Sequence, residues 1–153
     1  MALKDILVIS GQSGLFKYIS KGRNNVIAEN LSDGKRLAVS ATAKMSKLED
    51  ITIFTKEDDN VFLREVLKKI QVKENGGIAL SHKSPDAELK KYFEEVFPEY
   101  DRERVYMSDI RKIVQWYNLL TELGLTDFED PEAEKEENNE DESNEAVEKN
   151  ENN

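Results

Sequence analysis

Few side chains in this sequence could carry out covalent or metal chemistry. The chain has 153 residues, with one histidine (His82) and no cysteine. These counts exclude a thiol nucleophile, a thiolate metal site and a site built from several histidines. His82 lies just before a predicted helix start at Ser84–Pro85, and no G-x-S-x-G motif supplies a serine nucleophile for it. We interpret His82 as a surface loop residue and expect no catalytic residue, cofactor site or metal site.

Three pairs of adjacent carboxylates have the residue type that holds magnesium or serves a hydrolase. They are Glu49–Asp50, Asp58–Asp59 and Glu94–Glu95. Neighbouring side chains point in different directions on a helix and on a strand, so adjacent carboxylates do not converge on one ligand. We interpret all three pairs as solvated surface and expect the protein not to be an enzyme.

A glycine-containing loop at Gly11–Gly14 has the composition of a phosphate-binding loop. A Walker A loop requires glycine, four residues and then Gly-Lys-Ser/Thr, whereas Phe16 is five positions after Gly11. The G-x-x-G spacing also occurs in KH domains, where helices flank a loop that usually carries a basic residue. Here the two central residues are neutral and strand-forming residues follow. We expect a plain turn that leads into a strand.

Basic residues alternate with aromatic residues in the first half of the chain, a composition typical of surfaces that bind single-stranded nucleic acid. Residues 1–126, however, contain 19 acidic and 20 basic residues. Their net charge of +1 is low for a nucleic-acid-binding protein. Binding of RNA or DNA is therefore the alternative function, through Lys17, Lys21, Arg23, Lys35 and Arg36.

Short apolar segments separated by turn residues predict a small SH3-like β-barrel over residues 1–56. Asp33–Gly34 between two such segments is a strong hairpin signal. Ser46–Glu49 has the spacing of a capping box and predicts one helical turn. At the start of the chain, Leu3–Leu7 has helical spacing, but Ile6–Ile9 is equally a strand. The other predicted strands are Leu15–Ile19, Val26–Leu31, Arg36–Ser40 and Ile51–Thr55.

Apolar residues recur every three or four positions from Asn60 onward, which predicts a helical domain over residues 57–126. Trp116 lies near the margin of an apolar stripe, where an aromatic side chain suits a protein interface. The fold class is therefore α+β, a small barrel followed by about three helices. The predicted helices run from Val61 to Asn75, from Ser84–Pro85 to Pro98, and from Ser108 to Gly124.

Residues 127–153 differ from the rest of the chain in composition. They contain 13 acidic and 2 basic residues, a net charge of −11, and only four hydrophobic residues. So little apolar surface cannot offset the entropy lost on ordering, and we expect a disordered acidic tail. The tail is a solubilising extension or, alternatively, a polyanion that competes with nucleic acid for a basic surface.

Several motifs occur in the order found in an uncharacterised family of the Bacteroidota, which the chain resembles. The resemblance covers about residues 3–125 and implies a bacterial cytoplasmic protein with two domains of unknown function. It brings no activity and no site residues. The motifs are Leu3–Gly11, Gly14–Lys17, Asp33–Arg36, Ser46–Ile51, Lys73–Gly77 and Trp116–Leu120.

Localisation and function are predicted from the absence of recognisable membrane, targeting and catalytic motifs in the sequence. The longest hydrophobic run, Ile6–Ile9, is far too short to cross a membrane, and no basic segment followed by an apolar one opens the chain. We expect a cytoplasmic protein. The favoured function is a non-catalytic binding or adaptor module that engages a protein partner through the barrel–helix junction or through helix faces, with Trp116 at the interface.

Overall fold

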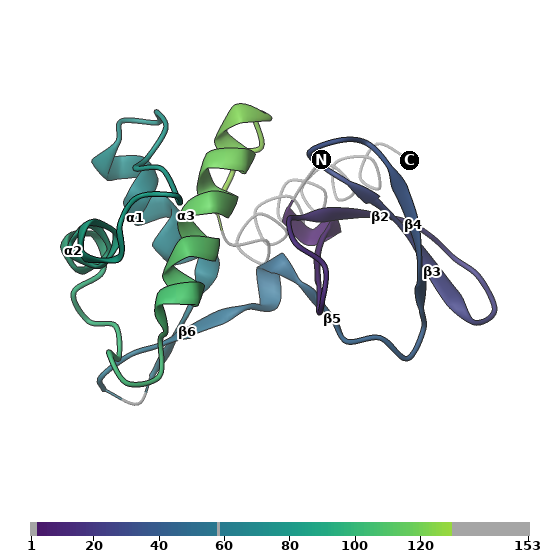
Figure 1. Cartoon of the computed structure of the whole chain (residues 1–153), viewed down its shortest axis with the longest axis horizontal. Coiled ribbons are helices and arrows are strands. Elements are labelled where there is room, and N and C mark those ends of the chain that lie inside the picture. Colours follow the sequence, from purple (N-terminus) through teal and green to yellow (C-terminus); the bar gives the residue numbers. More distant parts are fainter. Residues whose placement is uncertain (1–2, 58, 130–153) are drawn as a thin grey trace, which may run out of the picture.

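The computed structural model describes residues 3–57 and 59–129 of the chain, except for the side chain of Lys4. The first part of the chain forms a sheet, and the second part forms a group of three helices beside it (Figure 1). The predicted α+β fold class is confirmed. Among the residues described, none of the helices combines the length and hydrophobicity that crossing a bilayer requires.

The sheet has five antiparallel strands in the order β4-β3-β2-β1-β5. For the start of the chain the sequence predicts either a helix or a strand. The structure has both in turn, since the 3-10 turn η1 (Leu3–Asp5) leads directly into β1. A bulge between Tyr18 and Ser20 shifts the register of β2 against β3. The strands are β1 (Ile6–Ile9), β2 (Phe16–Lys21), β3 (Asn25–Asn30), β4 (Arg36–Ser40) and β5 (Met45–Lys47).

This sheet is not closed into a barrel. Within residues 3–57, its edge strands β4 and β5 do not pair with each other. After β4 the chain turns, with the N–H of Ala43 donating to the carbonyl of Ser40 at 2.9 Å. It then returns to the other edge, where Leu7 of β1 lies opposite Lys47 of β5. In place of the predicted closed SH3-like barrel, the first part of the chain forms an open five-stranded sheet.

The connection to the helices contains a helical turn and a hairpin. The turn η2 covers Leu48–Asp50 and has no side-chain cap, because Ser46 belongs to β5. The predicted turn is confirmed, but the predicted capping box is wrong. β6 (Thr52–Phe54) then pairs with β7 (Asn60–Phe62) in a separate two-stranded sheet. The sequence does not predict β5 or β7, since each is only three residues long and is stabilised by pairing with a distant segment.

Three amphipathic helices follow: α1 (Leu63–Lys73), α2 (Asp86–Val96) and α3 (Met107–Glu122). All three predicted helices are present, with α1 starting two residues later than predicted because Val61 and Phe62 belong to β7. At the start of α3, the Asp109 carboxylate accepts a hydrogen bond from the N–H of Tyr106 at 2.9 Å. This bond satisfies a donor that the helix itself cannot.

One apolar core joins the sheet to the helices. Ile6, Leu15 and Leu48 from the first part of the chain belong to the same buried cluster as residues of all three helices. The other face of the sheet has a smaller cluster that includes Leu7 and Phe16, as expected when successive side chains point to opposite faces. Burial of apolar surface therefore holds the two parts of the chain together.

The chain remains packed for several residues after α3. Phe128, which the sequence assigns to the tail, is only 1% exposed. Its ring centroid lies 6.2 Å from that of Tyr117 on α3. Residues 130–153, and with them most of the predicted acidic tail, lie outside the described residues. The predicted domain divisions at residues 56 and 126 stay predictions.

Candidate binding site at the junction of the sheet and the helices

A cleft lies where loops of the sheet face α3 and the loop between α1 and α2. We call it the junction cleft; its volume is about 440 Å³. The sheet side contributes a glycine from the β1–β2 loop and a serine from the β3–β4 turn. The cleft is lined by Gly14, Ser32, Ile78, Ala79, Ser81, His82, Lys83, Gln115, Trp116, Asn118, Leu119 and Glu122.

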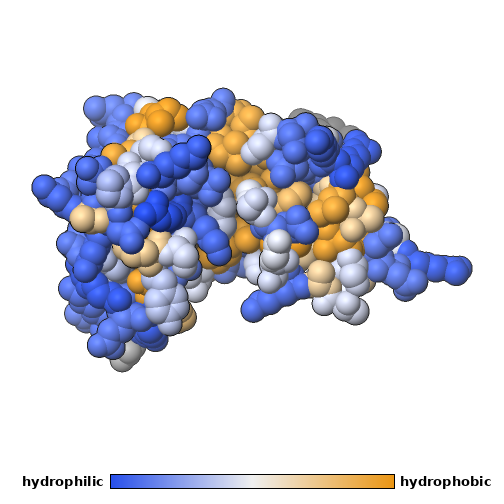
Figure 2. Space-filling model, in the orientation of Figure 1, coloured by the Kyte–Doolittle hydropathy of each residue, from blue (hydrophilic) through white to orange (hydrophobic). Residues whose placement is uncertain are grey.

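The apolar part of the junction cleft is partly open to solvent. Ile78 is 51% exposed, and Leu119 is half-buried. Figure 2 shows hydrophobic residues gathered on the surface where the helices meet the sheet. The sequence alone did not single out Ile78, although Ile78–Leu80 is the only apolar tripeptide in the polar stretch between α1 and α2.

Side chains of α3 hold the loop that forms one wall of the cleft. The Tyr117 hydroxyl donates to the Gly77 carbonyl at 2.7 Å, and Arg111 Nη1 donates to the His82 carbonyl at 2.6 Å. Asn118 Oδ1 accepts from the Ala79 N–H at 2.7 Å. Burial raises the pKa of the Tyr117 phenol, so its hydroxyl stays a donor at neutral pH. These bonds fix a segment that has no helix or strand of its own.

Replacing Asn118 by alanine is expected to lower the free energy of unfolding by about 1–3 kcal/mol, because the Ala79 N–H and the Leu80 carbonyl, which accepts from Asn118 Nδ2 at 3.2 Å, both lose their partner. Urea unfolding measures the loss, and amide hydrogen exchange locates it. Gln115→Ala is the control, since Gln115 lines the cleft on the same helix. Unchanged protection of the Ala79 amide in Asn118→Ala would contradict the assignment.

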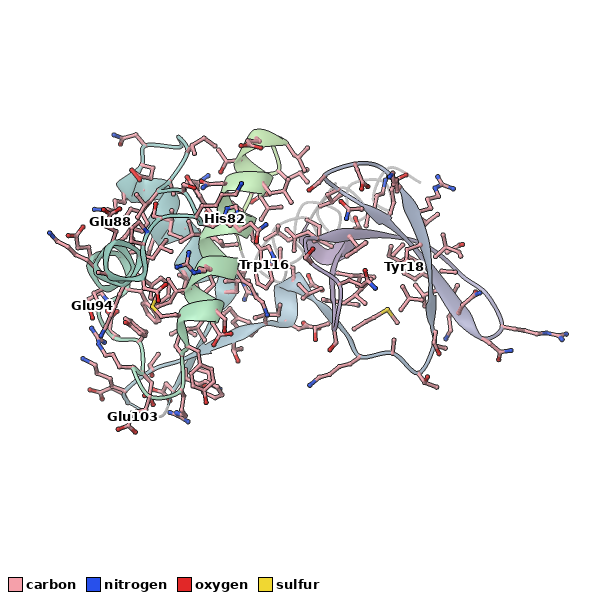
Figure 3. The ribbon with its side chains drawn as sticks, in the orientation of Figure 1. Tyr18, His82, Glu88, Glu94, Glu103 and Trp116 are labelled. Carbon is pink, nitrogen blue, oxygen red and sulfur yellow. The ribbon has the colours of Figure 1, made fainter. Side chains whose placement is uncertain are left out.

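His82 lies in a loop, as predicted, and also lines this cleft. Figure 3 shows His82 and Trp116 on the side of the helical part that faces the sheet. Within residues 3–57 and 59–129, the His82 ring makes no hydrogen bond to a carboxylate or a hydroxyl group, and no cluster of three metal-ligating side chains is present. The backbone of His82, through its carbonyl, is the part that α3 holds.

Trp116 is 8% exposed and lines both the junction cleft and a second depression beside the N-terminal half of α3. We call this depression the hairpin groove; its volume is about 190 Å³, and Ile51–Phe54 form its other wall. The predicted interface residue is therefore mostly buried and separates two surface clefts. A ligand in either cleft would contact only the small exposed part of the Trp116 side chain.

The hairpin groove ends at an exposed aromatic ring held by a charged network. Phe54 is 40% exposed, and the Arg104 guanidinium lies 4.5 Å from its ring centroid, a cation–π contact. Arg104 Nε also pairs with Asp101 Oδ2 at 2.7 Å. This hydrogen bond from Arg104, together with the N–H of Glu103, lowers the pKa of the Asp101 carboxyl below its ordinary value near 3.8.

Asp101→Asn is expected to remove a pH-dependent contribution to stability. Because the folded-state pKa of Asp101 is lowered, the carboxylate stabilises the folded wild-type protein fully above pH 3.8. This contribution to the free energy of unfolding is lost as the pH falls through the folded-state pKa. Urea unfolding of wild type and variant across a pH series measures the difference. Glu103→Gln is the control at an exposed neighbouring carboxylate. A difference that persists unchanged in acid would contradict the Arg104 contact.

The structure does not gather the five predicted nucleic-acid-binding cations. Lys21 and Arg23 lie at the β2–β3 hairpin, whereas Lys35 lies in the β3–β4 turn at the other end of β3. Six residues at ~3.3 Å each place these ends roughly 15–20 Å apart. Lys17 and Arg36 flank Glu29 in one row across three strands, and Arg36 Nε lies 3.5 Å from Glu29 Oε1. An acidic side chain therefore interrupts the basic row.

The Gly11–Gly14 loop is a turn, as predicted. Both glycines have positive φ, +85° and +88°, a conformation that other residues rarely adopt. A strand follows the loop and not a helix, so the helix dipole that supports phosphate binding in Walker A and Rossmann loops is missing here. Gly14 instead forms part of the wall of the junction cleft.

Comparison with known proteins places the chain in a family. Residues 3–48 match the Domain of unknown function (DUF5606), and residues 51–120 match the Domain of unknown function (DUF6852). A solution NMR structure of a protein from Bacteroides vulgatus is 43% identical, covers 82% of this chain and 90% of that chain, and superposes with a TM-score of 0.66. The chain belongs to this two-domain family.

The resemblance predicted from the sequence motifs is thereby confirmed. The two matched ranges meet at residues 48–51, where η2 leads into β6. The junction cleft draws on both ranges, since Gly14 and Ser32 lie in the first and Ile78 to Leu119 lie in the second. No curated protein matches the chain.

Proposed function

We propose that the protein is a non-catalytic binding module that holds a segment of a protein partner in the junction cleft. The sequence predicts a bacterial cytoplasmic setting for it. The observation that carries the proposal is the exposure of Ile78 and the partial exposure of Leu119 beside Trp116, in a cleft formed by both domains of the family.

The composition of the cleft suits a polypeptide. Apolar side chains such as Ile78 and Leu119 line it together with Ser32, Ser81 and Gln115, which supply hydrogen-bonding groups. Protein interfaces likewise combine apolar contacts with hydrogen bonds. Lys83 and Glu122 contribute one charge of each sign, so the cleft does not select strongly for a cation or an anion.

The alternatives from other classes receive less support. Catalysis by His82 would need a nucleophile and an orienting carboxylate within hydrogen-bonding reach, and the described residues place neither against its ring. Nucleic-acid binding would need a continuous basic surface. The five candidate cations lie in two groups, one of which includes Glu29.

Replacing Ile78 by glutamate is expected to weaken capture of the partner at least tenfold, since a charge would enter an apolar contact that contributes at least about 1.4 kcal/mol. The measurement is recovery of the co-purifying protein by the tagged full-length chain from extract with and without nuclease treatment. Val72→Glu is the matched control, because Val72 is also apolar and is 76% exposed on α1, outside the cleft.

The outcome separates the candidate functions. Loss of one discrete protein with Ile78→Glu but not with Val72→Glu supports the junction cleft. Equal recovery in both variants would reject it. Recovery that depends on nucleic acid and falls with Lys21→Gln and Lys35→Gln would instead favour the alternative function.

A further inference from the structure

A further groove, distinct from the junction cleft and the hairpin groove, lies between α1 and α2. Its volume is about 510 Å³. We call it the lysine groove because three lysines of α1 line it, together with an exposed valine that is 76% accessible. Two glutamates also line it, so the charged side chains of its wall sum to +1. The lining residues are Glu65, Lys68, Lys69, Val72, Lys73, Glu95 and Val96.

The described part of the chain ends on this groove. Gln71 Nε2 of α1 donates to the Thr126 carbonyl at 3.0 Å, and the next apolar side chain, Phe128, is buried against Tyr117. Glu129 then pairs with Lys68, with 3.1 Å between Oε2 and Nζ. The hydrogen bond that the Lys68 ammonium donates to the Glu129 carboxylate raises the pKa of Lys68. The chain therefore leaves the folded body with one carboxylate already on a groove lysine.

The sequence that follows is strongly acidic. Residues 130–153 contain 11 acidic and 2 basic residues, a net charge of −9. The first five of them, Asp130–Glu134, alternate acidic residues with proline and alanine. Of the other groove lysines, Lys73 pairs with Glu95 at 3.2 Å, whereas Lys69 is exposed and makes no ion pair within the described residues.

We propose that the lysine groove binds the acidic sequence that follows Glu129 in the same chain. The ammonium groups of Lys69 and Lys73 donate hydrogen bonds to its carboxylates, and Val72 contacts its small apolar residues. Tethering at Glu129 gives the acidic sequence an effective concentration of about millimolar at the groove. Weak surface pairs, each worth little alone, then suffice to keep it there. This contact leaves the junction cleft free, so it is independent of the proposed function.

A spin label in the full-length chain tests the proposal. The protein has no cysteine, so Asn138→Cys offers one labelling site without changing the net charge. Position 138 is nine positions after Glu129, and a chain segment of this length spans at most roughly 30 Å. Nitroxide broadening of the Val72 amide signal, measured by NMR, is expected to fall roughly threefold when Lys69→Gln and Lys73→Gln are combined. It is also expected to fall in about 0.5 M salt, where screening acts within about 4 Å.

The control variant carries Lys21→Gln and Lys35→Gln, which remove the same charge from the sheet. It is expected to leave the broadening at Val72 unchanged. Broadening that persists in the groove variant would show that the tether alone brings the label near α1, and this would overturn the proposal. Equal loss in both variants would also overturn it, since a general charge effect would then explain the contact.

Discussion

Phe93→Ala is expected to lower the free energy of unfolding by about 3–5 kcal/mol. Phe93 on α2 is fully buried. Its ring centroid lies 4.8 Å from that of Tyr100 and 6.2 Å from that of Phe97, both in edge-on geometry. Truncation removes these contacts and leaves a cavity that the surrounding helices fill only in part.

Urea unfolding at neutral pH measures the effect of Phe93→Ala. Phe93→Leu is expected to cost less, because it keeps most of the side-chain volume. Val72→Ala, on the exposed face of α1, is expected to stay within about 0.5 kcal/mol of wild type. A loss of less than about 1 kcal/mol for Phe93→Ala would show that the aromatic cluster is not part of a tightly packed core.

Phe128→Ala is expected to lower the free energy of unfolding by a similar amount, about 3–5 kcal/mol, although the sequence assigns this residue to an acidic tail. Phe128 is 1% exposed and packs against Tyr117. Tyr117 in turn holds the Gly77 carbonyl at the wall of the junction cleft. The substitution is therefore expected to speed hydrogen exchange in the loop before α2 as well as to destabilise the fold.

The neighbouring Glu129→Gln is the control for Phe128→Ala. Its salt bridge with Lys68 is exposed, and such pairs contribute little to stability. A cost for Phe128→Ala as small as that of Glu129→Gln would place the end of the folded body at Gly124 and contradict the packing of residues 125–129.

Local sequence patterns predicted most of the secondary structure. Arg36–Ser40 is a strand at the predicted bounds, because Asp33–Gly34 fixes the preceding turn and the larger apolar residues Leu37 and Val39 alternate with small or polar residues that are exposed. The third helix is equally well defined, since its apolar stripe spans four turns. In both cases the signal lies within the element itself.

Elements stabilised by distant partners could not be predicted in this way. β5 and β7 have three residues each and depend on β1 and β6 for their hydrogen bonds. Whether β4 meets β5 also depends on how the sheet bends and not on either strand's composition. Phe128 was missed for a similar reason: its acidic neighbours dominate the local composition, whereas its burial depends on Tyr117, eleven positions earlier.

The candidate site was predicted only in part. The sequence predicts that binding involves the junction of the two halves and Trp116. An aromatic residue at the margin of an apolar stripe indicates a contact in addition to the one between the helix and the core. Ile78 and Leu119 do not, since exposure is a property of the assembled surface. The same holds for the five cations, whose separation by the length of β3 depends on strand pairing.

The most direct test of the proposed function is site-specific photo-crosslinking in cells. A photoreactive amino acid replaces Ile78 in one full-length variant and Val72 in another, because both side chains are apolar and exposed. We expect a discrete crosslink to a second protein, resistant to nuclease, with the label at position 78, and no crosslink to a second protein with the label at position 72. Crosslinks to nucleic acid, or the same products from both positions, would contradict a protein-binding junction cleft.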